Sequence, residues 1–339
     1  MSTSDRSIPL PRITLLGTGG TIASRGADSL DLTGYIERKQ HFSIHELVEH
    51  FAEIRRVAEI TAVPYENFAS QAIGPRQWLE LAARVQDIAA AQPAPAGIVI
   101  THGTATLEET AYFLNLTLKV ACPVVMVGSQ RPATALGTDA GMNLLNAVRV
   151  AAASNSRGRG VLVVLNDEIH AAREVTKSST LKLHTFRSPD FGVLGHADAD
   201  RVSYYRTPER RRAPDTAFEV AGRETLPRVD MVMSYAGADG ALVRAAVAAG
   251  AKGIVSAGFA PGLGTADELA ALNEAAAAGV VIVQSSRVGS GRVVSFGAAQ
   301  PAPCVTADNL TPQKARVLLM LALAHTADIA AIQHLFATH

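Results

Sequence analysis

Three side chains stand where this chain could carry out nucleophilic chemistry. Thr21 ends the stretch "RITLLGTGGT", in which a short apolar run gives way to glycines, and Thr104 ends a second glycine turn, "HGT", after another apolar run. A threonine hydroxyl is a poor nucleophile until a base removes its proton, and Lys177 in "REVTKSST" becomes a base where burial removes its charge. Because parallel strands bind ligands at their C-terminal ends, both threonines can face one cleft.

The residues alone leave plainer explanations open. A tight turn in which Thr21 caps a helix or bonds to its own backbone explains the first motif as well. His102 fits a structural histidine at a strand end, and a lone lysine is usually a surface ammonium. A dinucleotide fingerprint, G-x-G-x-x-G, is disfavoured because Gly17 and Gly19 fill its first two positions but Ile22 fills the third.

Short apolar, β-branched runs supply the strands that would position these residues. They are bounded by Gly, Pro or Asn and alternate with helical patterns, which predicts a mostly parallel sheet. One helix is expected over residues 107–118, with a capping-box signature in Thr106 and Glu109. The strand runs lie at residues 12–17, 97–101, 122–129 and 160–166.

We expect an α/β protein with two unequal domains, each a largely parallel sheet flanked by helices. A chain of 339 residues exceeds the size at which a single core usually stops growing. Residues 1–204 are predicted to form the larger N-terminal domain and residues 229–339 the smaller C-terminal domain. The stretch 205–228, rich in proline and charge, is interpreted as the linker, and its basic run at 206–212 as a solvated segment.

Composition disfavours several classes of partner. Lys plus Arg and Asp plus Glu both number 31, so no net field attracts nucleic acid or an anionic membrane. Cys122 and Cys304 lie far apart without metal-ligand spacing, which predicts neither a disulfide framework nor a zinc site. The N-terminal "MSTSDRSIPLPR" lacks the apolar core of a signal peptide, and no run of about 18 apolar residues predicts a membrane span. We therefore expect a cytoplasmic protein.

Taken together, the motifs resemble the bacterial-type L-asparaginase family, in order and spacing, from residue 12 to about residue 324. The most specific signature is "TGGTI" with "HGT" and the later "VTK", and further matching segments are "PVVMVGSQRP", "GVLVVLND", "GIVSAGF", "SSRV" and "LTPQKARVLLMLAL". The resemblance implies a homotetramer of two intimate dimers, in which the partner's C-terminal domain completes each site. It implies a small-molecule amide substrate and neither a metal nor an organic cofactor.

The resemblance also implies catalytic roles. Thr21 matches the threonine that attacks the side-chain amide carbon and forms an acyl-enzyme, which water releases as acid after ammonia has left. Thr104 and Lys177 match the pair that activates the nucleophile or the water. Tyr35 matches a tyrosine on a mobile N-terminal lid that hydrogen-bonds to the nucleophile.

Substrate binding is implied for a second group. Ser70 and Gln71 in "NFASQ" match the pair that holds the substrate's α-carboxylate. The expected substrate-binding set is completed by positions in or beside the motifs, namely Gly103, Ala105 and Ser129.

Three departures concern the substrate's ammonium group. The family reads H-G-T-D, but Ala105 stands where that aspartate grips the ammonium. Gly237 stands where the partner subunit would supply an asparagine, and residues 289–304 lack the glutamate that the family places there. Asp239, two residues after Gly237, is the candidate substitute.

These departures divide the functional prediction. The first hypothesis is hydrolysis of L-asparagine or a close analogue. The second is the same chemistry on an amide or imide without a free α-ammonium group, such as a succinamate-like or N-acylated compound. Desolvating an ammonium without a counter-charge costs several kcal/mol, and the same loss favours a neutral Lys177. The third hypothesis is a non-catalytic carboxylate-binding protein that shares the fold.

Overall fold

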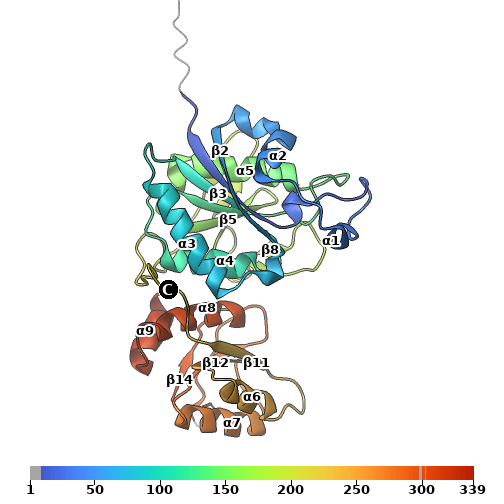
Figure 1. Ribbon diagram of the computed structural model, residues 1–339. Coiled ribbons are helices and arrows are strands. Elements are labelled where there is room, and N and C mark those ends of the chain that lie inside the picture. Colours follow the sequence, from blue (N-terminus) through green and yellow to red (C-terminus); the bar gives the residue numbers. More distant parts are fainter. Residues whose placement is uncertain (1–8, 298–299, 302) are drawn as a thin grey trace, which may run out of the picture.

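The chain folds into two α/β parts, one stacked on the other (Figure 1). The computed structural model describes residues 9–297, 300–301 and 303–339. The larger part, from β1 (Arg12–Gly19) to β10 (Val202–Tyr204), contains an eight-stranded sheet, and the smaller part begins at β11 (Val229–Met233) with a four-stranded sheet. This architecture confirms the predicted fold class.

The larger sheet is parallel in one half and antiparallel in the other. Its strand order is β10-β9-β6-β5-β4-β3-β1-β2, in which β1 to β5 run parallel while β6, β9 and β10 form an antiparallel edge. A separate hairpin joins β7 (Thr176–Lys177) to β8 (Phe186–Arg187). The remaining strands are β2 (Glu59–Phe68), β3 (Gly97–Thr101), β4 (Val124–Val127), β5 (Val161–Leu165), β6 (Glu168–Ala171) and β9 (Gly195–Ala197).

The apolar runs form the central strands because helices cover both faces of the sheet. Strands β3, β4 and β5 are buried at every position. Helices α3 (Pro75–Ala90) and α4 (Leu107–Thr117) pack on one face, and α2 (Ile44–His50) and α5 (Ala140–Ala152) pack on the other. Strand β2 escaped prediction because it is an edge strand of mixed polarity and includes Pro64, which an edge tolerates.

Helix α4 lies between the larger sheet and the smaller part of the molecule. It packs against α8 (Pro312–Leu323), so one apolar cluster runs from the sheet through α4 into α8. The capping box predicted at its start is wrong. Thr106 makes no cap hydrogen bond, because its hydroxyl donates instead to the Ser70 carbonyl at 2.7 Å.

The smaller part is a parallel sheet in the order β11-β12-β13-β14. Helices α6 and α7 cover one face, while α8 and α9 cover the face turned toward the larger part (Figure 1). Part of the acid-free segment 289–304 lies outside the described residues, as do residues 1–8. The bounds are β12 (Gly253–Gly258), β13 (Val281–Ser286), β14 (Cys304–Thr306), α6 (Ala241–Ala248), α7 (Ala266–Ala277) and α9 (Ile329–Thr338).

The connecting stretch 205–228 contains no helix or strand, yet it is anchored to both parts. Arg206 forms an ion pair with Glu174 of the larger part, and Arg210 bonds to Asp308 of the smaller part at 2.8 Å. These two arginines of the segment predicted to be solvated pair with carboxylates, although the Arg210 side chain is still 40% exposed to solvent.

No helix among the described residues is long and apolar enough to span a membrane.

Candidate active site

Neighbouring parallel strands β1 and β3 end at the same edge of the larger sheet. Gly17 pairs with Thr101 near the ends of these strands, so the residues that follow emerge together. Thr21 opens a short 3-10 helix directly after β1, and Thr104 follows the end of β3. The sheet thus brings the two threonine turns to one place.

The contact between the two turns depends on glycine. Gly20 has φ 88° and ψ −179°, a conformation that other residues adopt only under strain. A Cβ atom at Gly20 would lie 2.3 Å from the Cα of Gly103, and one at Gly103 would lie 2.6 Å from the Cβ of Ser70. The segments meet backbone to backbone, which fixes the position of Thr21 relative to Thr104.

The hydroxyl of Thr21 has a tyrosine partner. Its Oγ1 lies 3.1 Å from the hydroxyl oxygen of Tyr35, the first residue of α1 (Tyr35–Arg38). The preceding loop is held by the Asp31 carboxylate, which accepts backbone N–H bonds from Ala27 at 2.9 Å and from Tyr35 at 3.2 Å. These backbone bonds, led by that of Ala27, hold the pKa of Asp31 below its ordinary value.

The hydroxyl of Thr104 has a lysine partner. The Nζ of Lys177 lies 2.8 Å from Thr104 Oγ1 and 3.4 Å from Gln130 Oε1. Burial lowers the pKa of Lys177, while the Glu108 carboxylate acts in the opposite direction. This lysine therefore loses its proton more readily than a surface ammonium, as a base must.

A cavity of about 660 Å³ opens beside these groups, a size that suits a small-molecule ligand. Its basic lining residues are Lys39 and His41, and among the described residues that line it none is an Asp or Glu. Six predicted site residues line it, namely Thr21, Tyr35, Ser70, Gln71, Thr104 and Ala105.

Three predicted site residues do not line this cavity. Lys177 lies behind Thr104 and reaches the cavity through that hydroxyl. Gly103 packs against the backbone of Gly20 instead. Ser129 is buried and its hydroxyl donates to the Arg131 carbonyl at 2.6 Å, so its part in substrate binding stays a prediction.

Two further residues singled out in the sequence have structural surroundings. His102 is fully buried with Nδ1 2.8 Å from the Gly103 carbonyl, and burial lowers its pKa to about 4. A neutral histidine at a strand end fits the structural interpretation. The Asp239 carboxylate accepts the Ala241 N–H at 2.8 Å beside the start of α6, and it does not line the cavity of its own chain.

Two residues near Lys177 were missed by the sequence reasoning. Glu108 accepts the backbone N–H of Lys177 at 3.3 Å, and Gln130 contacts its Nζ. Gln130 follows the end of β4, beside β3, so the strand-end rule that located the threonines points to it as well. Glu108 gave no such signal, because it reads as an ordinary acidic residue in the first turn of a helix.

Among the described residues, no group of three or more His, Cys, Asp or Glu side chains is placed to hold a metal ion.

Comparison with known proteins defines the class. Residues 12–210 match the family "Asparaginase, N-terminal", and residues 228–336 match "Glutaminase/Asparaginase C-terminal domain". The chain belongs to the asparaginase family, and the protein is an amidohydrolase of the asparaginase type.

Its relatives resemble it over nearly their full length. The chain is 43% identical to the Haemophilus influenzae protein "Probable L-asparaginase periplasmic" over 96% of this chain and 93% of the relative. It is 41% identical to "L-asparaginase 2" of Escherichia coli, over 99% and 95% respectively. The crystal structure of the "Probable Cytoplasmic L-asparaginase" from Campylobacter jejuni superposes with a TM-score of 0.92 at 38% identity, covering 97% of this chain and all of that one. These names place the relatives in different compartments, so membership in the family does not assign this protein to a compartment.

A Gly20→Ala variant tests the backbone contact. We expect it to lose about 3 kcal/mol of unfolding free energy, through both the clash with Gly103 and the strained φ, and to lose most of its amidase activity. Gly222→Ala is the matched control, since Gly222 has φ 73° and open space around it, so that about 1 kcal/mol of strain remains. Chemical denaturation measures both losses. Equal losses in the two variants would show that the contact contributes nothing.

Proposed function

We propose that this protein hydrolyses the side-chain carboxamide of L-asparagine or a close analogue, with Thr21 as the nucleophile. One observation carries the proposal. Two threonine hydroxyls face one cavity, and each is bonded to a separate proton-carrying side chain: Tyr35 at 3.1 Å from Thr21, and Lys177 at 2.8 Å from Thr104. Relatives named L-asparaginase support the substrate class.

In the first half-reaction, Thr21 Oγ1 forms a bond to the amide carbon. The Tyr35 hydroxyl accepts the threonine proton and donates its own to the departing nitrogen, for which its 3.1 Å contact with Thr21 is suitable. The carbon–nitrogen bond breaks, ammonia leaves, and the acyl group stays on Thr21 as an ester. Nucleophile and proton carrier thus act as one pair.

In the second half-reaction, water attacks the ester. The Thr104 hydroxyl accepts the water proton and passes its own to the neutral amine of Lys177, which lies 2.8 Å away. The bond between the acyl carbon and Thr21 Oγ1 then breaks, and the proton returns from Lys177 through the Thr104 hydroxyl to Thr21 Oγ1 across the shared cavity, which restores the starting state. The lowered pKa of Lys177 favours the neutral amine that this step needs.

The site differs in how it would bind the two ends of the substrate, the α-carboxylate and the α-ammonium group. Ser70 and Gln71 line the cavity where we propose that they hold the substrate's α-carboxylate. Ala105 offers no negative charge to a substrate ammonium group. Among the described residues that line the cavity, none is an Asp or Glu, whereas Lys39 and His41 are basic. This observation favours a second candidate substrate, an amide or imide that lacks a free α-ammonium group.

The assembly and the domain boundaries are part of the proposal. The residues that line the cavity lie between Gly20 and Ala105, all in the larger part of the chain. A homotetramer in which a partner's C-terminal domain closes the open side would complete such a cavity. We divide the chain at 1–204, 205–228 and 229–339, with the last domain serving the partner's site.

A Thr21→Ala variant tests the mechanism. We expect ammonia release from L-asparagine or succinamate to fall at least about a thousandfold with the protein still folded, because the variant lacks the hydroxyl that contacts Tyr35. Thr18→Val is the control, since the buried Thr18 hydroxyl donates to the Thr101 carbonyl at 2.8 Å and faces no substrate. The control should keep kcat within about threefold. Turnover by the alanine variant at the parent rate would contradict the proposal.

An Ala105→Asp variant tests the substrate preference. A carboxylate at this position should attract the ammonium group of L-asparagine, which succinamate lacks. It would be the one acid on the cavity lining among the described residues. We expect kcat/KM for L-asparagine relative to succinamate to rise about tenfold or more. Ala105→Asn, of the same shape without charge, should leave the ratio near that of the parent. If the aspartate and asparagine variants give the same ratio, residue 105 does not set recognition of the amino end.

A further inference from the structure

We propose that Glu108 is the positioning residue for Lys177, and that its carboxylate is shared with Lys314 of α8, which ties the smaller part of the molecule to the catalytic base. The inference rests on the proposed role of Lys177. It concerns a carboxylate behind the cavity rather than on its lining, in a chain whose position 105 has no acid.

Glu108 occupies an unusual place for a carboxylate. It lies in the first turn of α4 and is only 6% exposed. Its Oε1 accepts the backbone N–H of Lys177 at 3.3 Å, whereas its Oε2 is buried with no hydrogen-bond partner among the described residues. A buried carboxylate requires compensation by positive charge, and a single backbone bond does not supply it.

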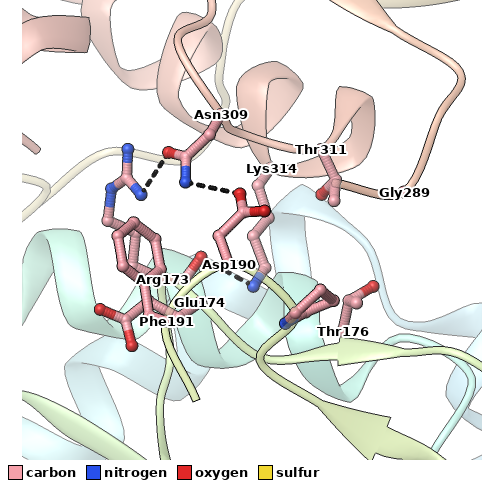
Figure 2. A pocket seen from close by; sticks show the side chains of 10 residues that line it. Arg173, Glu174, Thr176, Asp190, Phe191, Gly289, Asn309, Thr311 and Lys314 are labelled. Atoms are coloured by element: carbon pink, nitrogen blue, oxygen red, sulfur yellow. Dashed lines mark hydrogen bonds between the residues drawn. The ribbon is translucent and has the colours of Figure 1, made fainter. Parts of the chain in front are cut away.

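Lys314 is a buried cation that reaches across the boundary between the two parts of the molecule. It is 1% exposed, and its ammonium donates to the carbonyls of Ala172 at 2.9 Å, Arg173 at 3.0 Å and Val175. Figure 2 shows Lys314 extending from its helix to this segment, beside Arg173 and Glu174. The segment leads directly into β7, which carries Lys177. Lys314 therefore holds the approach to the catalytic lysine.

The Glu108 carboxylate acts on the pKa of both lysines. Burial lowers the pKa of Lys314 to about 8 and also lowers that of Lys177, and for each of them Glu108 is the first group that acts in the opposite direction. Thr104 and Gln130 face Lys177 as neutral partners. The other charged groups near this trio are Glu109, Arg173, Glu174 and Arg316.

The arrangement has a functional consequence. Because Glu108 does not line the cavity, its carboxylate opposes the effect of burial on the pKa of Lys177 without taking up space for substrate. The residue at position 105 is thereby free to vary without leaving Lys177 unopposed. Because α8 belongs to the smaller part, docking of that part places Lys314 on the segment that leads to the base.

A Glu108→Gln variant tests the link to Lys177 through the pH profile of kcat/KM. Activity rises with pH as Lys177 loses its proton, and removal of the anion lowers the pKa of Lys177, so the acid limb should move down by about one pH unit. The control is Glu109→Gln, because Glu109 is next in the helix and burial raises its pKa to about 7. The control limb should stay in place. An unmoved limb in folded Glu108→Gln, or an equal move in both variants, would overturn the inference.

Thermal unfolding of Glu108→Gln, Lys314→Met and the double variant tests the shared charge without reference to activity. Glu108→Gln removes the anion that opposes Lys314, Lys314→Met removes the cation that opposes Glu108, and the double change removes both members of the pair. We expect the fall in Tm of the double variant to be smaller than the sum of the two single falls, by at least about 3 °C. Additive losses would refute the sharing. If Thr21→Ala kept full turnover, the proposed function would fail while this stability result still stood.

Discussion

The site depends on a contact between two bare backbones at the ends of adjacent strands. Gly20 and Gly103 approach so closely that a methyl group on Gly20 would overlap the other turn. Fixing a glycine in one conformation costs more conformational entropy than fixing any other residue. The cost of fixing Gly20 and Gly103 here must be offset by packing elsewhere in the fold. The parallel register of β1 and β3 brings the turns together, and the missing side chains let Thr21 and Thr104 share a cavity.

Around that contact, burial controls the charges that the chemistry needs. Burial lowers the pKa of Lys177, as its proposed role as a base requires, and Glu108, the carboxylate that opposes this effect, does not line the cavity. The chain belongs to the asparaginase family, and we propose that Ala105 leaves the substrate's amino end without a counter-charge. In this proposal catalysis and specificity depend on different residues, so a change in one need not abolish the other.

The sequence was most informative where physical rules act locally. Buried strands of apolar residues and threonines in glycine turns at strand ends could be predicted, because both follow from the geometry of a parallel sheet. Hydrogen bonds between side chains and residues far away in the sequence could not be predicted. The Thr106 hydroxyl donates to the Ser70 carbonyl, 36 residues away, instead of capping its helix. Glu108 became distinctive only when α8 placed Lys314 nearby.

The most direct test of the account is mass spectrometry of the enzyme quenched with acid during turnover of an amide substrate. The account predicts an acyl group of the substrate's mass on the peptide that contains residue 21, and none on that peptide in enzyme quenched without substrate. An acyl group found on the peptide that contains Thr104, or no added mass on either peptide under conditions in which the ester accumulates, would contradict the assignment of Thr21 as the nucleophile.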